Sequence, residues 1–230
     1  MGQTRTGVDW TDWLARGPGF VLGQVALGGG ESANVTFSGP YFTAVTGVIL
    51  EPYWSPSSTY SGTQLKNPPP SSDLIVIDGG PETFKLSFSQ AVTNPVLAIT
   101  SLGLTNSTRS INIRSVMNFD HPFEVLSTGA GYAAGGQWTP FVEVGNSLYG
   151  IESSGVVRFS GAFTELSWTS PLREINEFSN VVGTYMFTLV SAGCDNFRLA
   201  NSAHASSLAP GSTSCALPGR AARPARQPAR

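Results

Sequence analysis

Hydrophobic residues in this chain recur in short bursts that are separated by chain-reversing residues. Within several bursts every second residue is apolar, as in Phe84, Leu86 and Phe88. A two-residue period belongs to a strand that has one face in a core and the other in water. The frequent Gly, Pro, Asn and Ser between the bursts are typical of many brief strands. The pattern therefore predicts an all-β fold in which two antiparallel sheets form a jelly-roll-like β-sandwich.

About twelve short strands are expected from this pattern. Their ranges are 20–27, 33–38, 43–50, 73–78, 83–89, 96–100, 110–116, 123–127, 141–144, 155–159, 164–169 and 184–190. In one of them Val96, Leu97, Ala98 and Ile99 are apolar without alternation, which predicts a strand that is covered on both faces. The only segment with helical signals is 171–179, where two glutamates follow a proline, and it is short enough to be a loop instead.

The 230 residues suit a single domain. We expect an N-terminal extension at 1–14, the sandwich at 15–198, and a low-complexity, disordered tail at 199–230. Residues 67–72 contain three consecutive prolines, which deny hydrogen bonds to a sheet. They are expected to form an extended connector between an N-terminal hairpin region and the core.

Composition narrows the class of protein. Charged residues make up 12% of the chain, against an average of about 25%, as in exported β-proteins that stay soluble without many charges. The body is acidic, which argues against nucleic acid as a partner, whereas the last eleven residues hold four arginines and no acid. No apolar run reaches the roughly 20 residues of a membrane span. Residues 1–10 do not resemble a signal peptide, so a mature form, or one without its leader, is expected.

The two cysteines enclose a loop that is rich in small residues. Cys194 and Cys215 are separated by 20 residues. In an oxidising compartment they are expected to form a disulfide, which would contribute about 3 kcal/mol by restricting the unfolded chain. The alternative is a pair of free thiols, because their spacing matches no metal-binding or redox motif.

Four collinear segments together match a known pattern: Gly47–Leu50 with Trp54–Pro56, Pro69–Gly80, Phe88–Gly103 and Gly155–Thr169. They resemble exported bacterial proteins of the PEP-CTERM-associated type. The resemblance implies export and a β-sandwich, and it supplies no catalytic residues because the group has no settled activity. This chain lacks the Pro-Glu-Pro motif and the apolar anchor that follows it in that group.

The search for catalytic chemistry finds no local motif. The only histidines are His121, in a turn, and His204, in the low-complexity end. The segment from Gly145 to Gly150 is one residue too long for a nucleophile elbow. The protein is therefore not expected to be an enzyme. A glycoside hydrolase is kept as an alternative, because its two carboxylates come from different strands and leave no local signature. The carboxylates available for such a pair are Glu51, Asp73, Asp78, Glu82, Glu143, Glu152, Glu165, Glu174 and Glu177.

No cofactor is expected, although calcium is an alternative. Loop carboxylates of β-sandwiches often bind this ion. The pairs that could contribute are Asp9 with Asp12, and Asp73 with Asp78. Neither pair has the dense alternation of a dedicated calcium loop.

Aromatic residues near turns are the strongest binding signal. One group is Tyr53, Trp54 and Tyr60, and a second group, Tyr132, Trp138 and Phe141, flanks a glycine-rich loop. Aromatic faces on rigid loops stack on sugar rings, so Tyr53, Trp54, Tyr60 and Trp138 are predicted to bind a ligand. The alternative is that they close the ends of the sandwich.

Two functions are therefore expected ahead of catalysis. The first is a secreted, non-catalytic binding module for a polysaccharide of the cell surface or matrix. The second is a self-assembling subunit of an extracellular filament or surface layer. It is motivated by a weakly charged surface rich in Gly, Ser and Thr, together with an unanchored N-terminal segment at 1–14, in which Trp10 and Trp13 would join the sheet edge of another copy.

Overall fold

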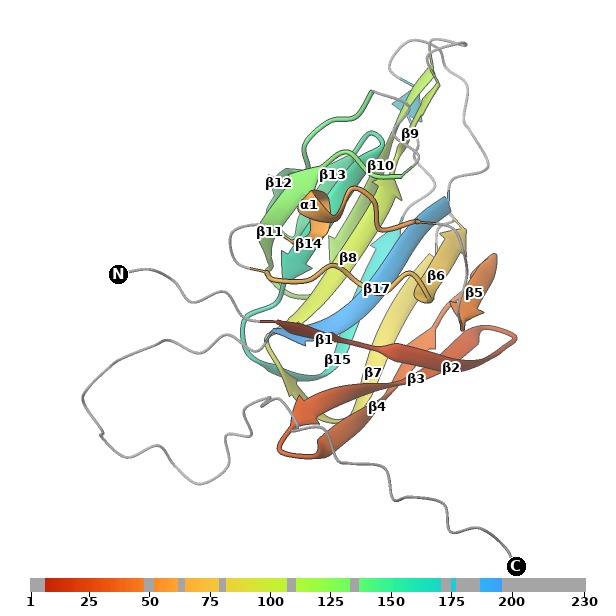
Figure 1. Cartoon of the computed structure of the whole chain (residues 1–230). Helices are drawn as coiled ribbons and strands as arrows, with labels where there is room; N and C mark the ends of the chain where they lie inside the picture. The colour runs from red at the N-terminus through yellow and green to blue at the C-terminus, as the bar shows by residue number, and fades with distance from the viewer. Residues whose placement is uncertain are drawn as a thin grey trace, which may run out of the picture.

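The computed structural model describes residues 7–47, 52–61, 65–78, 82–106, 111–132, 137–170, 175–176 and 187–195. The described strands form two antiparallel sheets that pack face to face (Figure 1), which confirms the predicted all-β sandwich. No helix within these ranges is long and apolar enough to cross a membrane.

The first sheet has seven strands. Its order is β11 (Glu124–Gly129), β14 (Ser153–Arg158), β8 (Pro95–Leu102), β17 (Phe187–Asp195), β6 (Asp73–Asp78) and β5 (Thr43–Thr46), and β1 (Val8–Trp10) also pairs with β17. Cys194 lies in β17, opposite Pro95 of β8. Cys215 lies outside the described residues, so the disulfide stays a prediction.

The second sheet has ten strands. Its order is β12 (Val142–Val144), β13 (Ser147–Gly150), β10 (Ile111–Phe119), β15 (Ala162–Ser170), β7 (Glu82–Thr93), β4 (Glu31–Ser38), β3 (Phe20–Gly28) and β2 (Asp12–Gly17). Two short strands, β9 (Leu104–Asn106) and β16 (Ile175–Asn176), also pair with β10. The helical alternative at 171–179 is therefore wrong at Ile175–Asn176, and its other residues lie outside the described part.

The main core lies between the two sheets. Phe84, Leu86 and Phe88 of β7 all point into it, as their alternation predicts. Phe84 stacks on Trp168 of β15, with ring centroids 5.6 Å apart and 19° between the ring planes. Burial of several large aromatic side chains stabilises the packing of one sheet on the other.

A second hydrophobic cluster lies on the outer face of the seven-stranded sheet. Leu97 and Ile99 of β8 face the main core, whereas Val96 and Ala98 face this second cluster. The strand is thus covered on both faces, which confirms the prediction from its unbroken apolar run. The cover is a segment that we call the strap, residues 52–61 and 65–72, which contains the four-residue helix α1 (Ser57–Tyr60) and crosses this face in Figure 1.

The proline-rich connector belongs to this strap, and one part of its predicted role is wrong. The residues from Asn67 to Ser72 contain no strand, as expected. However, they do not separate an N-terminal hairpin from the core, because β3 and β4 continue the same sheet as β7.

The described part of the predicted extension at 1–14 belongs to the sandwich, which corrects that prediction for residues 8–14, whereas residues 1–6 lie outside the described part. Residues Val8–Trp10 pair with β17, and the chain then crosses to the other sheet, where Asp12–Gly17 pair with β3. Trp13 is 1% exposed and lies in the main core, and the indole nitrogen of Trp10 donates to the carbonyl of Asn67 at 3.4 Å. The prediction that Trp10 and Trp13 are free to join another copy is therefore wrong.

Candidate ligand-binding site

Four chain segments meet at one end of the sandwich, on the side of β11 and β14. They are the part of the strap with α1, the turn between β8 and β9, the turn between β13 and β14, and the glycine-rich loop that follows β11, of which residues 130–132 are described. Thr59 of α1 donates its hydroxyl to the carbonyl of Ala130 in the glycine-rich loop at 2.7 Å. This bond fixes the strap against the loop, so their side chains have defined relative positions.

The two aromatic groups predicted from sequence meet here. The ring centroids of Tyr53 and Tyr132 are 5.3 Å apart, and the ring planes are inclined by 69°. Tyr132 is 46% exposed and Tyr53 is half-buried. We call this pair the aromatic corner. It joins a predicted ligand-binding residue, Tyr53, to Tyr132, which the sequence marked only as a flank of the glycine-rich loop.

Trp54 and Tyr60 do not present a face to solvent. Trp54 is 5% exposed and Tyr60 is 0% exposed, and their rings pack edge to face with centroids 5.2 Å apart. Both belong to the cluster between the strap and the sheet. The prediction that they stack on a ligand is therefore wrong; they hold the strap in place by hydrophobic burial.

Trp138 lies on a segment that is fixed to the turn between β13 and β14. It is 38% exposed. The amide of Thr139 donates to the carbonyl of Ile151 at 3.1 Å, and the hydroxyl of Ser153 donates to the carbonyl of Thr139 at 2.7 Å. Its predicted role in ligand binding is compatible with this exposure. Phe141, by contrast, is buried in the main core.

Beneath the aromatic corner lies a group of polar side chains, three with hydroxyls and one with a carboxyl group. We call it the buried polar cluster: Thr100, Ser101, Ser154 and Glu152. The hydroxyls of Thr100 and Ser154 are 3.1 Å apart and share a hydrogen bond, and the amide of Ser101 donates to the Ser154 hydroxyl at 3.1 Å. The hydroxyl of Ser101 donates to the carboxylate of Glu152. The cluster thus joins the turn after β8 to the turn before β14.

Glu152 is the charged member of this cluster. It is 2% exposed, and burial raises the pKa of its carboxyl group, while hydrogen bonds from Ser101 and the amide of Thr105 act in the opposite direction. A buried carboxylate is unfavourable unless it is hydrogen-bonded. This burial was not predictable from the sequence, in which Glu152 is one of many scattered carboxylates.

The glycine-rich loop comes very close to the buried polar cluster at Gly131. A Cβ atom added there would lie 2.1 Å from the Ser154 hydroxyl oxygen and 2.5 Å from that of Thr100. Only glycine allows this approach without displacement of the hydroxyls. The loop therefore covers the polar groups and brings Tyr132 next to Tyr53.

Tyr60 places one more hydroxyl at this position. The pKa of Tyr60 is raised, and burial is the largest cause. The nearby hydroxyls of Thr100 and Ser154 lower this pKa, and the charge of Glu152 raises it. Its hydroxyl lies near those two residues but has no well-aligned hydrogen-bond partner. The site thus contains an aromatic surface above hydroxyl groups, one of which is unsatisfied.

The described parts of the four segments do not contain a pair of carboxylates. A glycosidase of the usual type needs two carboxyl groups about 5–10 Å apart on either side of the scissile bond. In the described parts of the four segments Glu152 is the sole carboxylate, and it is buried. Of the other carboxylates considered, Glu143 is exposed on β12, Glu165 pairs with Lys85, and Glu51, Glu174 and Glu177 lie outside the described residues.

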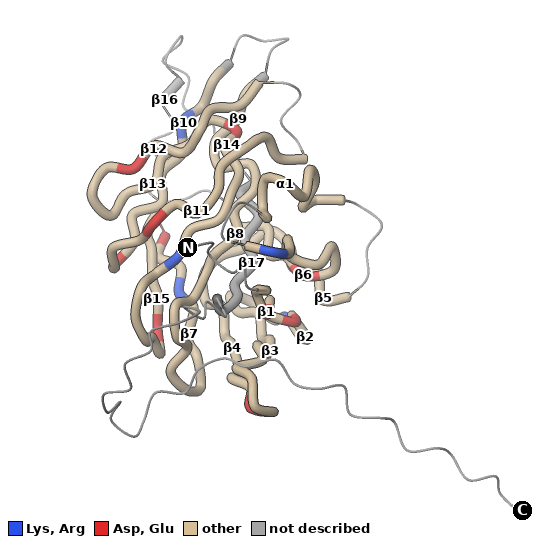
Figure 2. Tube along the Cα trace, turned by 60° about the vertical axis from the view of Figure 1, so that its left-hand side comes forward, with Lys and Arg blue, Asp and Glu red and all other residues tan. Residues whose placement is uncertain are grey.

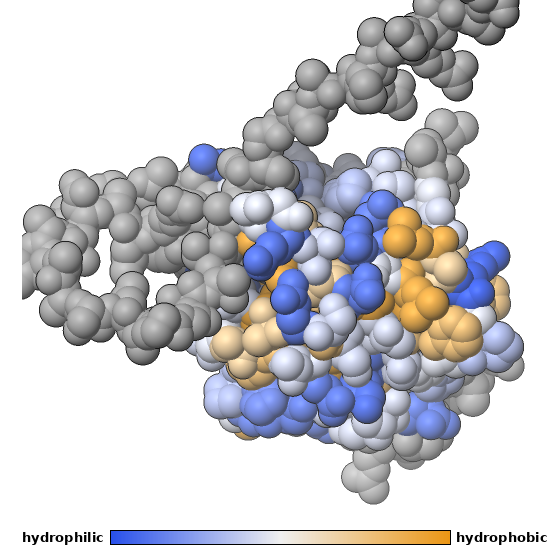
Figure 3. All heavy atoms as spheres, turned by 90° about the horizontal axis from the view of Figure 1, so that it is seen from below, coloured by the Kyte–Doolittle hydropathy of each residue, from blue (hydrophilic) through white to orange (hydrophobic). Residues whose placement is uncertain are grey.

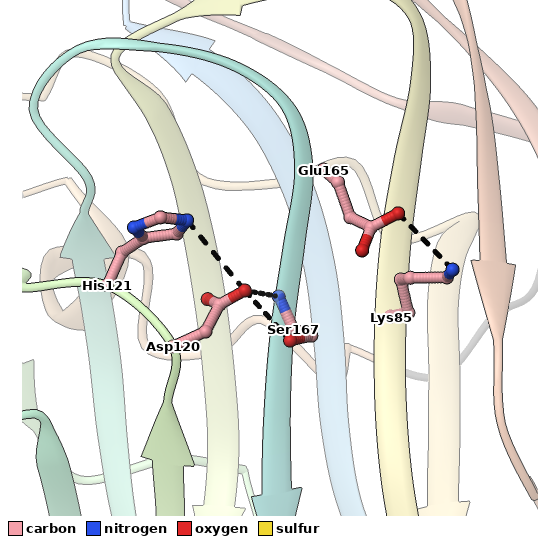
Figure 4. A network of polar contacts seen from close by, with 5 residues as sticks. All are labelled: Lys85, Asp120, His121, Glu165 and Ser167. Carbon is pink, nitrogen blue, oxygen red and sulfur yellow. Dashed lines mark hydrogen bonds and ion pairs between the residues drawn. The ribbon is translucent and has the colours of Figure 1, made fainter.

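A surface network on β15 contains serine, histidine and aspartate but is not arranged as a catalytic triad (Figure 4). The amide and hydroxyl of Ser167 donate to one carboxylate oxygen of Asp120 at 2.9 and 2.8 Å, and His121 Nε2 is 3.8 Å from the same atom. In a triad the histidine lies between the serine and the acid. Here the acid lies between the other two, so the histidine cannot accept the serine proton through this network.

One of the two pairs predicted as calcium ligands is held apart by a strand. Asp73 and Asp78 are the two ends of β6, which places them about 16 Å apart along a strand. Asp73 is buried and accepts hydrogen bonds from the Trp13 amide at 3.1 Å and the Ser72 hydroxyl at 2.8 Å. Burial raises its pKa against these bonds. Within the ranges that the structure describes, no three acidic, histidine or cysteine residues gather as metal ligands.

A second surface feature is an exposed hydrophobic patch formed by Leu14, Phe20, Leu22 and Phe42. The first three belong to the β2–β3 hairpin, and Figure 3 shows hydrophobic side chains gathered on the corresponding side. Phe42 precedes β5, which is the edge of the seven-stranded sheet opposite to β11. The patch therefore lies away from the aromatic corner, and Phe42 offers a control position.

Comparison with known proteins gives no further guide to this site. The chain matches no family model, no curated protein and no solved structure.

Proposed function

We propose that this protein is a secreted, non-catalytic module that binds polysaccharide at the cell surface or in the extracellular matrix. The observation that carries the proposal is the aromatic corner, in which Tyr53 and the exposed Tyr132 meet on two loops that are fixed to each other. The C–H groups on one face of a sugar ring pack favourably on an aromatic face, while its hydroxyls need hydrogen-bond partners.

The surroundings of the corner support a binding role. The strap is held by the burial of Trp54 and Tyr60, and residues 130–131 of the glycine-rich loop contact Thr59, Thr100 and Ser154. Loops that are ordered before the ligand arrives lose little conformational entropy on binding. The corner therefore has the rigidity that a binding surface of small area requires.

Self-assembly, the other function expected from the sequence, keeps only one of its two supports. The weakly charged surface rich in Gly, Ser and Thr remains, but the N-terminal segment is not free, because β1 and β2 are paired within the molecule itself. We therefore place polysaccharide binding first.

The proposal is tested by a glycan array with the full chain and two variants. Tyr132→Ala removes the exposed ring, and we expect it to weaken binding by about tenfold, which corresponds to about 1.4 kcal/mol. The matched control is Phe42→Ala, which removes an aromatic ring that is 67% exposed, against 46% for Tyr132, from the hydrophobic patch and should leave binding unchanged. Trp138→Ala shows whether the neighbouring segment also contributes.

Thermal unfolding of each variant distinguishes loss of contact from loss of fold. Tyr132 is largely exposed, so its replacement should leave the melting temperature close to that of the wild type. A wild-type chain that binds no glycan, or a Tyr132→Ala variant that binds as well as the wild type, would contradict the proposal.

A further inference from the structure

The four segments around the aromatic corner contain almost no charged residues. The sequence has no Lys, Arg, Asp or Glu from Pro52 to Leu65 or from Thr128 to Pro140. The turns after β8 and before β14 add a single charged residue, the buried Glu152. In Figure 2 the turn that contains α1 carries no charged residue along its described length. Lys66 is the nearest cation in the sequence, directly after the uncharged stretch.

The lack of cations matters for the class of sugar that can bind. Carboxylate and sulfate groups of acidic polysaccharides are recognised by Arg and Lys side chains, which offset the cost of removing those groups from water. The corner offers two tyrosine side chains in place of such cations, because the hydroxyls of Thr100 and Ser154 are buried beneath the glycine-rich loop. Moreover, Glu152 in its charged form would repel an anionic ligand.

The angle between the two rings also matters. The ring planes of Tyr53 and Tyr132 are inclined by 69°, with centroids 5.3 Å apart. Rings that are so far from coplanar cannot both lie flat on one plane surface. A corner of this kind can instead place one ring against the face of a sugar and the other against its edge.

On the basis of the proposed function, we infer that the aromatic corner binds a soluble, uncharged glycan chain rather than an acidic polysaccharide or the flat surface of a crystalline one. Stacking on Tyr132 supplies hydrophobic contact, and the phenolic hydroxyls of Tyr53 and Tyr132 bond to the sugar hydroxyls. The absence of ion pairing makes the interaction insensitive to salt.

The inference is tested by the class of polysaccharide that the full chain prefers. Affinity electrophoresis is run in gels that contain soluble neutral polysaccharides (mannan, xylan or hydroxyethyl cellulose) or anionic ones (alginate or polygalacturonate). Binding to microcrystalline cellulose and chitin is measured by sedimentation. Tyr132→Ala and Phe42→Ala are run beside the wild type in each assay.

We expect at least about tenfold tighter binding to one of the neutral soluble polysaccharides than to any anionic or crystalline one. This binding should be lost in Tyr132→Ala, retained in Phe42→Ala, and unchanged between low and high salt. Preference for an anionic or a crystalline polysaccharide, with the same dependence on Tyr132, would overturn the inference and leave the proposed function standing. Binding to none of them would instead overturn the proposed function itself.

Discussion

At the scale of single residues, the candidate site depends on two side chains whose backbone conformations are unusual. Ser101 and Glu152 have φ angles of +59° and +53°, in the left-handed region that favours glycine. Such a conformation costs roughly 1–3 kcal/mol and persists only where the surroundings enforce it. Here the hydrogen bond between the two side chains joins the turn after β8 to the turn before β14. The glycine-rich loop of the aromatic corner packs on Thr100 and Ser154 in the same cluster.

The burial of Glu152 and the contact between Tyr53 and Tyr132 could not be predicted from the sequence, for a physical reason. The burial of Glu152 results from the packing of strands that are distant in sequence, so its immediate neighbours do not reveal it. In the same way, the sequence marked Tyr53 and Tyr132 as members of separate loops, and only the fold of the strap brings them into contact. The sequence indicated which types of residue would form the site, but it did not indicate which residues would contact each other.

Glu152→Gln is expected to change how stability depends on pH. Because burial raises the folded-state pKa of Glu152, its contribution to stability is present below the unfolded pKa and is lost as pH rises through the folded value. The free energy of unfolding of the wild type should therefore fall, relative to that of the variant, between acidic and neutral pH. Urea unfolding at a series of pH values measures this difference.

The control for this experiment is Glu165→Gln, which removes a carboxylate from an exposed ion pair with Lys85. Exposed pairs contribute little, so this variant should follow the wild type at every pH. Parallel stability curves for the wild type and Glu152→Gln would show that the buried carboxyl group does not titrate as proposed. Asp73, whose pKa is raised in the same direction, is present in all three proteins.

At the scale of elements, the strands with regular alternation were predictable and the irregular ones were not. The strand predicted at 73–78 coincides with β6, and the expected strand at 83–89 is contained in β7. By contrast, β2 has a bulge between Trp13 and Ala15, which interrupts its alternation of buried and exposed residues. This irregularity explains why an N-terminal extension was predicted in place of two strands.

Asn67 holds the first of these missed strands in place. Its side-chain oxygen accepts from the amide of Val8 at 2.8 Å, and its side-chain nitrogen donates to the carbonyl of the same residue at 2.9 Å. Asn67→Ala should lower the free energy of unfolding by about 1–3 kcal/mol, because it leaves both backbone groups of Val8 without these partners. Chemical denaturation measures the effect.

Asn34→Ala is the matched control for that variant. The side chain of Asn34 is exposed on β4, so its loss should change stability by no more than about 0.5 kcal/mol. Equal stability of the Asn67→Ala and Asn34→Ala variants would mean that the strap does not anchor β1 through this residue.

At the scale of the whole molecule, the arrangement is a two-sheet sandwich with a partial third layer. The apolar run in β8 indicated that something covers both of its faces, but the sequence did not identify the cover. The structure shows that it is the strap, which buries Trp54 and Tyr60 and leaves Tyr53 beside Tyr132. The same packing that removes two predicted ligand-binding residues from solvent thus builds the corner to which we assign binding.

The most direct test of this account is hydrogen–deuterium exchange of the full chain, alone and with the neutral polysaccharide that it binds best. Bound ligand should slow the exchange of amides in residues 52–61 and 128–132, which hold the aromatic corner. Exchange in β4 and β7 of the opposite sheet should not change. Protection confined to that opposite sheet, or to the hydrophobic patch of the β2–β3 hairpin, would contradict the assignment of the aromatic corner as the binding site.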